Sequence, residues 1–270
     1  NVFCGRHQSF CITSNNYVYG CGYGSYGQLG NGGSSNYSYM SRVNLSTSYT
    51  WKKVDCLYYH SGFLASNGYL YMSGRNYDGQ IGVGDDYPDR YYSPVRVRTD
   101  VADFACAYYA TVVCTNNGSV YAWGENHDQM LGTSYSGSEQ HSQLQVQNLS
   151  GITKVAAGRY HFLALKDDGT VWSWGRNNSN SQLGRSGTAN TPAQIPGLSN
   201  IIEIHCTYYG GRAVDNNGNV YSWGEWGSGR LGLPDLSNDV STPTKLPGLT
   251  GMNHVRQCES FGLAFGYYPN

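Results

Sequence analysis

The sequence is poor in charge and has no long apolar run. Only 13% of its 270 residues are charged, whereas about 25% is usual in soluble domains. The net charge is -1 and no block of Lys and Arg occurs. The sequence therefore lacks the basic patch that would attract DNA, RNA or an anionic membrane. No run of about 18 apolar residues is present, and the sequence predicts no membrane-spanning helix. We therefore expect neither a nucleic acid nor a membrane as partner.

Patterns that indicate catalysis or metal binding are also missing. The seven His residues show no H-x-x-x-H spacing, and no C-x-x-C pair occurs. No Ser, Cys or Thr lies in a nucleophile elbow. The glycine-rich stretch 22–33 precedes neither a Lys nor helix-forming residues, which argues against a phosphate-binding loop. The sequence predicts a protein that is not an enzyme and holds no metal or cofactor.

Glycine and aromatic residues are abundant instead: the chain has 36 Gly, 25 Tyr and 6 Trp. This composition favours a loop-rich, all-β fold. A strand-like segment that ends in Gly recurs about every 50 residues, a period typical of repeat architectures. Its five copies are VYGCG (18–22), LYMSG (70–74), VYAWG (120–124), VWSWG (171–175) and VYSWG (220–224).

Each repeat has the order expected of a four-stranded antiparallel sheet. Hairpin turns such as NNG at 116–118 and DDG at 167–169 precede the recurring strand. Stacked four-stranded units of this length are typical of the blades of a β-propeller. We expect a single β-propeller domain over 1–270, in a six-position ring with a short last blade or, alternatively, in a five-blade ring. The repeats are about 1–50, 51–100, 101–151, 152–200 and 201–250, and a partial sixth over 251–270 has two strands at 254–258 and 261–265.

The fourth repeat carries a family resemblance. Its segment VAAGRYHFLALKDDGTVWSWGRNNSNSQLG (155–184) resembles the regulator of chromosome condensation repeat, and the likeness extends over essentially the whole chain. The resemblance implies a β-propeller, but it does not select a function, because members include a nuclear exchange factor for a small GTPase and protein inhibitors of β-lactamases. His161 lies in the family loop and is expected to form a structural hydrogen bond.

Several residues that recur in register are expected to be structural. The tryptophans at the third-strand position should pack between blades: Trp123, Trp174 and Trp223. The last glycine of each glycine-rich loop should be required by the backbone, either because φ is positive there or because two blades approach closely. These glycines are Gly30, Gly82, Gly132, Gly184 and Gly232.

Three pairs of tyrosines are the candidate binding residues. They fall between the first and second strands of their repeats, so we expect them at one end of the propeller. Tyrosine offers a large amphipathic contact area at low entropic cost and is favoured on recognition surfaces. Alternatively, the rings only cover the mouth of the channel. The pairs are Tyr58 with Tyr59, Tyr108 with Tyr109, and Tyr208 with Tyr209.

Eight cysteines suggest disulfides or small buried side chains. Five of them, Cys4, Cys56, Cys106, Cys206 and Cys258, end the first strand of a repeat, where repeat four has Ala157. The disulfide hypothesis pairs Cys4 with Cys11 and Cys106 with Cys114, while Cys11 with Cys21 is an open alternative. Sequons that permit glycosylation lie at Asn36, Asn44, Asn117, Asn148 and Asn177.

Three functional hypotheses follow. The first is a secreted, extracellular structural protein that self-assembles into a filament or coat, because the chain starts at Asn1 without Met and has a neutral Tyr/Gly/Ser-rich composition. Tyr267 and Tyr268, beside the edge of the two-stranded element, are its candidate assembly residues. The second is a module that binds a protein or a glycan through the tyrosine pairs. An exchange factor is the weakest hypothesis, because no catalytic constellation supports it.

Overall fold

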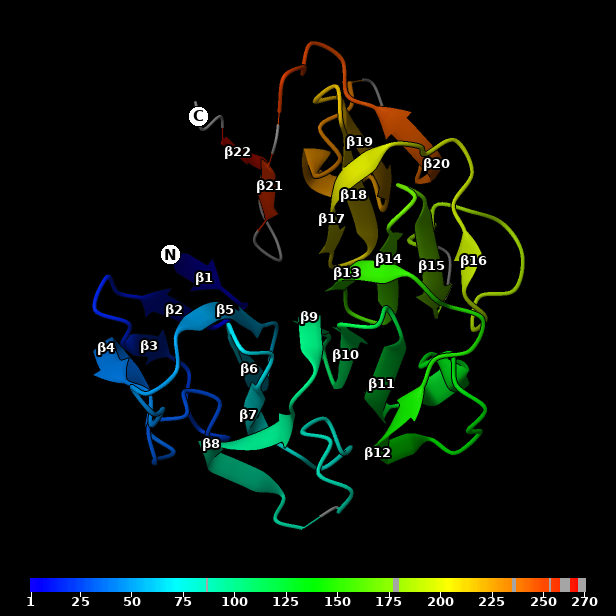
Figure 1. Ribbon diagram of the computed structural model, residues 1–270. Helices are drawn as coiled ribbons and strands as arrows, with labels where there is room; N and C mark the ends of the chain where they lie inside the picture. The colour runs from blue at the N-terminus through cyan, green and yellow to red at the C-terminus, as the bar shows by residue number, and fades with distance from the viewer. Residues whose placement is uncertain (86, 177–179, 235–236, 253, 258–262, 267–270) are drawn as a thin grey trace.

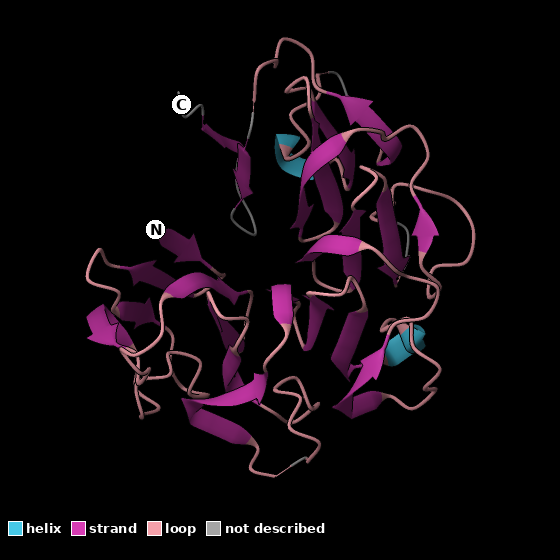
Figure 2. Ribbon diagram, in the orientation of Figure 1, coloured by secondary structure: helices cyan, strands magenta, loops and turns pink. Residues whose placement is uncertain are grey.

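The computed structural model describes residues 1–85, 87–176, 180–234, 237–252, 254–257 and 263–266. They form five four-stranded antiparallel sheets and one two-stranded sheet. Figure 2 shows strands joined by loops, with two short 3₁₀ turns at His127–Gln129 and Gly227–Gly229. The prediction of an all-β propeller with five full repeats and a two-stranded sixth element is confirmed.

The strands of each blade run outwards from a common axis in chain order (Figure 1). The innermost strands are β1 (Val2–Cys4), β5 (Trp51–Cys56), β9 (Val101–Cys106), β13 (Ile152–Ala157) and β17 (Ile201–Thr207). The second strands are β2 (Gln8–Ile12), β6 (His60–Ala65), β10 (Ala110–Thr115), β14 (His161–Lys166) and β18 (Gly210–Asp215). The third strands are β3 (Val18–Gly22), β7 (Leu70–Arg75), β11 (Val120–Glu125), β15 (Val171–Gly175) and β19 (Val220–Gly224). The fourth strands are β4 (Tyr37–Arg42), β8 (Arg90–Arg98), β12 (Glu139–Gln145), β16 (Ala193–Gln194) and β20 (Val240–Lys245).

The sixth element consists of β21 (His254–Gln257) and β22 (Leu263–Gly266), and β21 lies against β17. The arc of sheets is open: β1 and the sixth element lie on either side of an opening (Figure 1). The sheets of the described residues therefore do not close into a ring, and the choice between a six-position ring with a short last blade and a five-blade ring stays a prediction.

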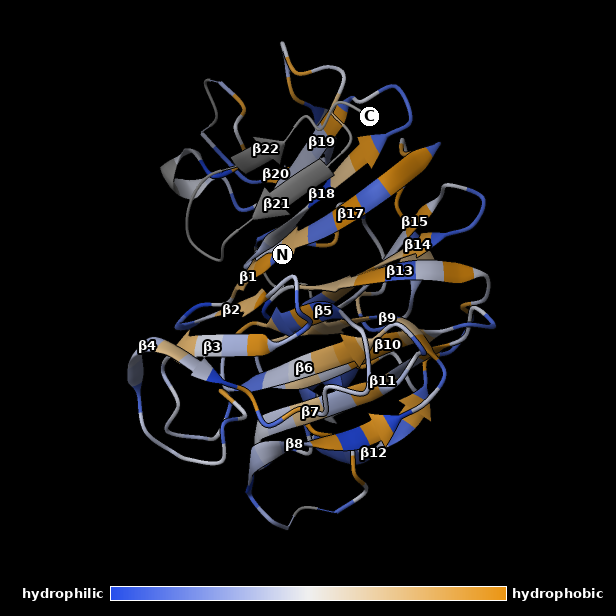
Figure 3. Ribbon diagram, turned by 60° about the vertical axis from the view of Figure 1, so that its left-hand side comes forward, coloured by the Kyte–Doolittle hydropathy of each residue, from blue (hydrophilic) through white to orange (hydrophobic). Residues whose placement is uncertain are grey.

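Burial follows the position of each strand within its blade. The second strands β6 and β10 are buried along their whole length, because a neighbouring blade covers each face. In the innermost strand β17 the buried residues Ile201, Ile204 and Thr207 are separated by less buried ones, and Figure 3 shows polar bands on it between apolar ones. The core therefore lies between the blades, and the innermost strands bring polar side chains to the axis.

Three buried tryptophans pack against glycines of the preceding blade. Trp123, Trp174 and Trp223 are fully buried. A Cβ atom at Gly184 would lie 2.8 Å from Cδ1 of Trp223, and the glycines at the same place in the two preceding blades approach the other two rings as closely. The predicted packing role of the tryptophans is confirmed. All five loop glycines have positive φ, as predicted: Gly30 (64°), Gly82 (80°), Gly132 (70°), Gly184 (63°) and Gly232 (69°).

Gly184→Val should lower the free energy of unfolding by at least about 1 kcal/mol more than Gly197→Val. Both glycines have positive φ, at 63° and 79°, so both substitutions strain the backbone. Only Gly184 also meets a ring, since nothing lies within 4 Å of a Cβ at Gly197. Urea denaturation of both variants measures the difference. Equal losses would show that contact with Trp223 does not matter.

The predicted disulfides within this chain are wrong for the described cysteines. All seven are free thiols: Cys4, Cys11, Cys21, Cys56, Cys106, Cys114 and Cys206. In β1 and β2, Cys4 lies opposite Ser9 and Cys11 opposite Val2. Cys4 and Cys11 are therefore diagonal neighbours across the two strands. The Cα atoms of such neighbours are about 7–8 Å apart, which is beyond the span of a disulfide.

The other two pairings fail for the same kind of reason. Cys114 faces Asp103, which is an odd number of residues from Cys106, so the two thiols point to opposite sides of the sheet. Cys21 faces Ser9, two residues from Cys11, which gives another diagonal. Cys258 lies outside the described residues.

His161 forms the structural hydrogen bond that was predicted. Its Nε2 lies 2.9 Å from the carbonyl oxygen of Gly210 in the next blade, and the side chain is buried. His60 has the same position in β6, and its Nε2 lies 3.0 Å from the hydroxyl of Thr111. Burial lowers the pKa of His60 to about 3 and that of His161 to about 4. Both imidazoles are therefore neutral links between blades near pH 7.

Candidate partner-binding end of the propeller

The loops between first and second strands lie at one end of the propeller. Antiparallel pairing brings the end of each third strand beside them, and a repeated backbone hydrogen bond fixes the contact. The N–H of Arg75 donates to the carbonyl of Tyr59 over 2.9 Å, and the N–H of Arg176 donates to that of Tyr160 over 2.8 Å. These loops are therefore held in place by the sheets below them.

The structure brings the six candidate tyrosines together at this end, as the sequence predicted. The rings of Tyr58 and Tyr108 stack with centroids 4.2 Å apart. Tyr208 continues the cluster, with its centroid 6.3 Å from that of Tyr108. Tyr59, Tyr109 and Tyr209 each lie beside their partner within the pair. Their role in binding stays a prediction.

Two arginines complete this cluster, and the sequence analysis missed them. Arg6 and Arg159 occupy, in blades one and four, the loop position that Tyr58, Tyr108 and Tyr208 occupy in the other three. The signal was present in the motifs GRH (5–7) and GRYH (158–161). These two motifs stand where the other repeats carry a tyrosine pair, but only the tyrosine pairs were predicted to bind. We call the five side chains Arg6, Tyr58, Tyr108, Arg159 and Tyr208 the Tyr–Arg ring.

The contacts of the Tyr–Arg ring form a closed cycle. The guanidinium carbon of Arg6 lies 4.9 Å from the centroid of Tyr58, which stacks on Tyr108. The guanidinium carbon of Arg159 lies 5.0 Å from the centroids of both Tyr108 and Tyr208. Arg6 closes the cycle at 6.0 Å from Tyr208. These are cation–π distances, so two charges are held by three aromatic rings over the axis.

The protonation states around the ring are well defined. Burial, followed by a hydrogen bond with Tyr58, raises the pKa of Tyr108, so its hydroxyl stays neutral near pH 7. Burial disfavours the charge of Arg159, but the surrounding tyrosines, Tyr160 and Tyr208 first, outweigh this and raise its pKa. The ring is therefore cationic over the whole physiological range.

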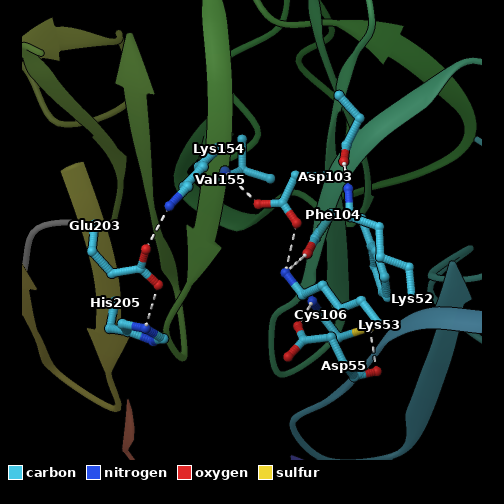
Figure 4. A network of polar contacts seen from close by, with 11 residues as sticks. Lys52, Lys53, Asp55, Asp103, Phe104, Cys106, Lys154, Val155, Glu203 and His205 are labelled. Atoms are coloured by element: carbon cyan, nitrogen blue, oxygen red, sulfur yellow. Dashed lines mark hydrogen bonds and ion pairs between the residues drawn. The ribbon is translucent and has the colours of Figure 1, made fainter. Parts of the chain in front are cut away.

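A ladder of charges lies deeper along the axis (Figure 4). Equivalent positions of four successive innermost strands alternate in sign: Lys53, Asp103, Lys154 and Glu203. Nζ of Lys53 lies 2.8 Å from Oδ1 of Asp103, and Lys154 pairs with Glu203. Each of these ion pairs joins one blade to the next. The ladder was not found from the sequence, because only the juxtaposition of blades makes the four positions neighbours.

Glu203 has a further partner on its own strand. Its Oε1 lies 3.3 Å from Nε2 of His205. Burial would raise the pKa of Glu203, but the hydrogen bonds from His205 and Lys154 outweigh it and lower the pKa to about 2. Glu203 therefore contributes a stable negative charge to the inter-blade contact, and we assign the charge ladder to stability.

A model of the family described as "Regulator of chromosome condensation (RCC1) repeat" matches residues 15–64, 117–165, 168–210 and 217–260. A second model with the same description matches residues 101–129 and 152–182. The chain belongs to the RCC1 repeat family. The predicted family resemblance is thus confirmed.

Curated relatives of this RCC1-repeat chain are larger proteins. It is 28% identical over 196 residues to human "Probable E3 ubiquitin-protein ligase HERC6", which covers 70% of this chain and 19% of that protein. It is 25% identical over 187 residues to the "Ultraviolet-B receptor UVR8" of Arabidopsis thaliana, covering 68% of this chain and 42% of that protein. The chain spans less than half the length of these relatives.

Solved structures with this fold include human WBSCR16, with a TM-score of 0.86 and 23% identity over 99% of this chain and 71% of that chain. Yeast RCC1 (Prp20) bound to Kap60 has a TM-score of 0.83 and 20% identity over 96% of this chain and 66% of that chain. At these identities the likeness establishes the fold alone.

The remaining predicted sites of this RCC1-repeat chain are placed as follows. Asn36, Asn44, Asn117 and Asn148 are exposed, and their glycosylation stays a prediction. Asn177, Tyr267 and Tyr268 lie outside the described residues. Among the residues that the structure describes, no cluster of three or more His, Cys, Asp or Glu side chains is arranged to hold a metal ion. No helix in that part of the chain has the length and apolar character of a membrane span.

Proposed function

We propose that this RCC1-repeat propeller is a protein-binding module whose partner docks on the Tyr–Arg ring. The observation that carries the proposal is the closed cycle of cation–π and stacking contacts at the axis. Tyr and Arg are enriched among the residues that dominate binding energy at protein interfaces. Here they occupy one register position in five blades and meet at one place.

Rigidity of the ring supports the proposal. The N–H of Arg6 donates to the carbonyl of Leu57 over 2.9 Å, and the N–H of Arg159 donates to that of Tyr208 over 3.1 Å. Each bond ties the loop of one blade to the loop of the next. A surface that is ordered before binding loses little conformational entropy on association.

The relatives agree with a binding role. Prp20p of Saccharomyces cerevisiae, which shares this fold with a TM-score of 0.76 and 21% identity over 89% of this chain and 61% of that chain, is described together with its binding to Gsp1p and histones. We propose for this chain a docking role without catalysis.

Site-specific photocrosslinking tests the proposal. Benzoylphenylalanine is placed at Tyr58 or at Tyr208 in the ring, and at Tyr39 on the outer strand β4 as a matched control, since Tyr39 is 66% exposed. We expect the same protein to be crosslinked from both ring positions in native extract and not from Tyr39. Arg159→Ala should reduce its yield.

Crosslinks of equal yield and identity at Tyr39 and at the ring would refute the proposal, as would the absence of any protein adduct at both ring positions. Thermal unfolding of each variant confirms that the propeller is intact before crosslinking. Tyr39 is a suitable control because it is an exposed tyrosine outside the ring.

A further inference from the structure

The guanidinium group of Arg159 is shared by four tyrosine rings. Its central carbon lies 5.0 Å from the ring centroid of Tyr108, 4.7 Å from that of Tyr160, 5.0 Å from that of Tyr208 and 5.7 Å from that of Tyr209. All four distances are cation–π distances. We call these four residues the tyrosine cage. They belong to blades three, four and five, so one side chain connects three blades.

The polar contacts of Arg159 also lead to the tyrosine cage. Its backbone N–H donates to the carbonyl of Tyr208 over 3.1 Å, and its Nη1 donates to the hydroxyl of Tyr209. Among the residues that the structure describes, no Asp or Glu forms an ion pair with Arg159, and its Nε is buried without an acceptor. The charge of Arg159 is therefore stabilised by aromatic rings and not by a carboxylate.

The neighbouring arginines are held differently. Arg75 pairs with Asp78, and Arg176 pairs with Asp128 over 2.7 Å. Each of these two arginines also lies over a tyrosine ring, but a carboxylate fixes its position. Removal of Arg159 breaks no ion pair within the described part of the chain. What its removal takes away is the common contact of the four cage rings.

We propose that Arg159 is the positioning residue of the docking surface. Its guanidinium group occupies a cation site, the tyrosine cage, and so holds the loops of three blades in the arrangement that the partner meets. The inference rests on the proposed function, because it assigns Arg159 a role in docking. A planar guanidinium group suits this site, since it stacks on rings and still donates in its own plane to the hydroxyl of Tyr209. Without it, the rings must be ordered during association, which raises the entropic cost of docking.

Chemical rescue tests the inference. Arg159→Ala removes an ethylguanidinium group from the side chain, so the free ethylguanidinium ion is the probe, and ethylurea is the neutral control compound of the same shape. Acetylation by N-acetylimidazole, located by mass spectrometry, measures the reactivity of each tyrosine in the chain without partner. Arg42→Ala is the matched control, because Arg42 is exposed and its guanidinium carbon lies 4.2 Å from the centroid of Tyr17, away from the ring.

In Arg159→Ala we expect the four cage tyrosines to be acetylated about fivefold faster than in the wild type, because the rings lose their common contact. Crosslinking of the partner from benzoylphenylalanine at Tyr58 should fall by about tenfold. Ethylguanidinium should reverse both effects, and ethylurea should reverse neither. Arg42→Ala should leave the cage tyrosines at their wild-type rates.

Arg159→Lys is the conservative variant. It keeps a cation in the tyrosine cage without the planar fork of donors, so its acetylation rates should lie between those of the wild type and of Arg159→Ala. Thermal unfolding confirms that each variant is folded. If Arg159→Ala does not fold, Arg159→Lys takes its place: faster acetylation of the cage than in the wild type supports the inference, and an unchanged rate overturns it.

Wild-type acetylation of the cage in folded Arg159→Ala would overturn the inference, since an arginine that only contacts the partner leaves the free chain unchanged. Equal rescue by ethylurea, or an equal effect of Arg42→Ala on the cage, would also overturn it. The two proposals fail separately. A specific crosslink from Tyr58 with unchanged acetylation in Arg159→Ala removes the positioning role alone. Rescue of the acetylation rates without any specific crosslink removes the docking role.

Discussion

Trp223→Ala is expected to lower the free energy of unfolding by about 3–5 kcal/mol, the usual loss for a large aromatic side chain removed from a core. Trp223 is fully buried and packs in one cluster with Leu163 of the preceding blade and Ala213 of its own. Its indole N–H also donates to the carbonyl of Gln182 over 3.1 Å. The substitution therefore leaves a cavity between two blades and removes this hydrogen bond between them.

Trp226→Ala is the matched control for this prediction. Trp226 is 41% exposed, and its removal should change the free energy of unfolding by no more than about 0.5 kcal/mol. Urea denaturation, with far-UV circular dichroism as the signal, measures both variants. Similar losses for Trp223 and Trp226 would contradict the assignment of the tryptophan positions to inter-blade packing.

Acid should weaken the propeller through Glu203. The pKa of Glu203 is lowered from 4.5 to about 2 in the folded protein. A carboxylate whose folded pKa lies below its unfolded pKa stabilises the protein fully above the unfolded value and loses this contribution as the pH falls through the folded value. We expect a loss of about 3 kcal/mol between pH 4.5 and pH 2 from this one group.

Glu203→Gln isolates this contribution. Asp168 also has a pKa lowered to about 2, by hydrogen bonds from Thr170 and Lys166, so acid sensitivity alone does not identify Glu203. The variant should be less stable than the wild type at pH 7 and should have a flatter dependence of unfolding free energy on pH below 4.5. Chemical denaturation measures the unfolding free energy of both proteins at each pH. An equal dependence on pH in the variant and in the wild type would exclude the charge ladder as the source of the acid sensitivity.

The fold could be predicted because its key residues recur in register. In the last three of the five full repeats a tryptophan on the third strand packs on a glycine of the preceding blade, as Trp123 does on Gly82. The recurrence of both residue types in the repeats can be read from the sequence. The arrangement of the sheets in space could not be predicted in the same way, because it depends on contacts between blades, which no single repeat encodes.

Only the tyrosines of the candidate site could be predicted from the sequence. The tyrosines were found because they occur as adjacent pairs, whereas Arg6 and Arg159 each occur in a different local context. The repeats align these two arginines with Tyr58 in the sequence, but their contacts with the tyrosine rings become visible only when loops of different blades meet at the axis. The disulfide hypothesis failed for a similar reason. The sequence predicts that Cys4 and Cys11 lie in neighbouring strands, but it does not give the register of the two strands, which keeps the two residues apart.

Assembly into an extracellular filament stays a prediction, since Tyr267 and Tyr268 lie outside the described residues. Particle size in native extract tests it directly. Deletion of residues 266–270 should shift large particles to monomers if this edge carries the contact, and assembly of the shortened chain would show that it does not.

Hydrogen–deuterium exchange tests the docking role most directly. Exchange is compared between the chain alone and the chain bound to the protein that is crosslinked from position Tyr58. It is followed in the loops of the Tyr–Arg ring and in the turns at the other end of the propeller. The account predicts slower exchange at 5–7, 57–59, 107–109, 158–160 and 208–209, and unchanged exchange at 13–17, 115–119, 166–170 and 215–219. Protection at the opposite turns with none at the ring loops would contradict it.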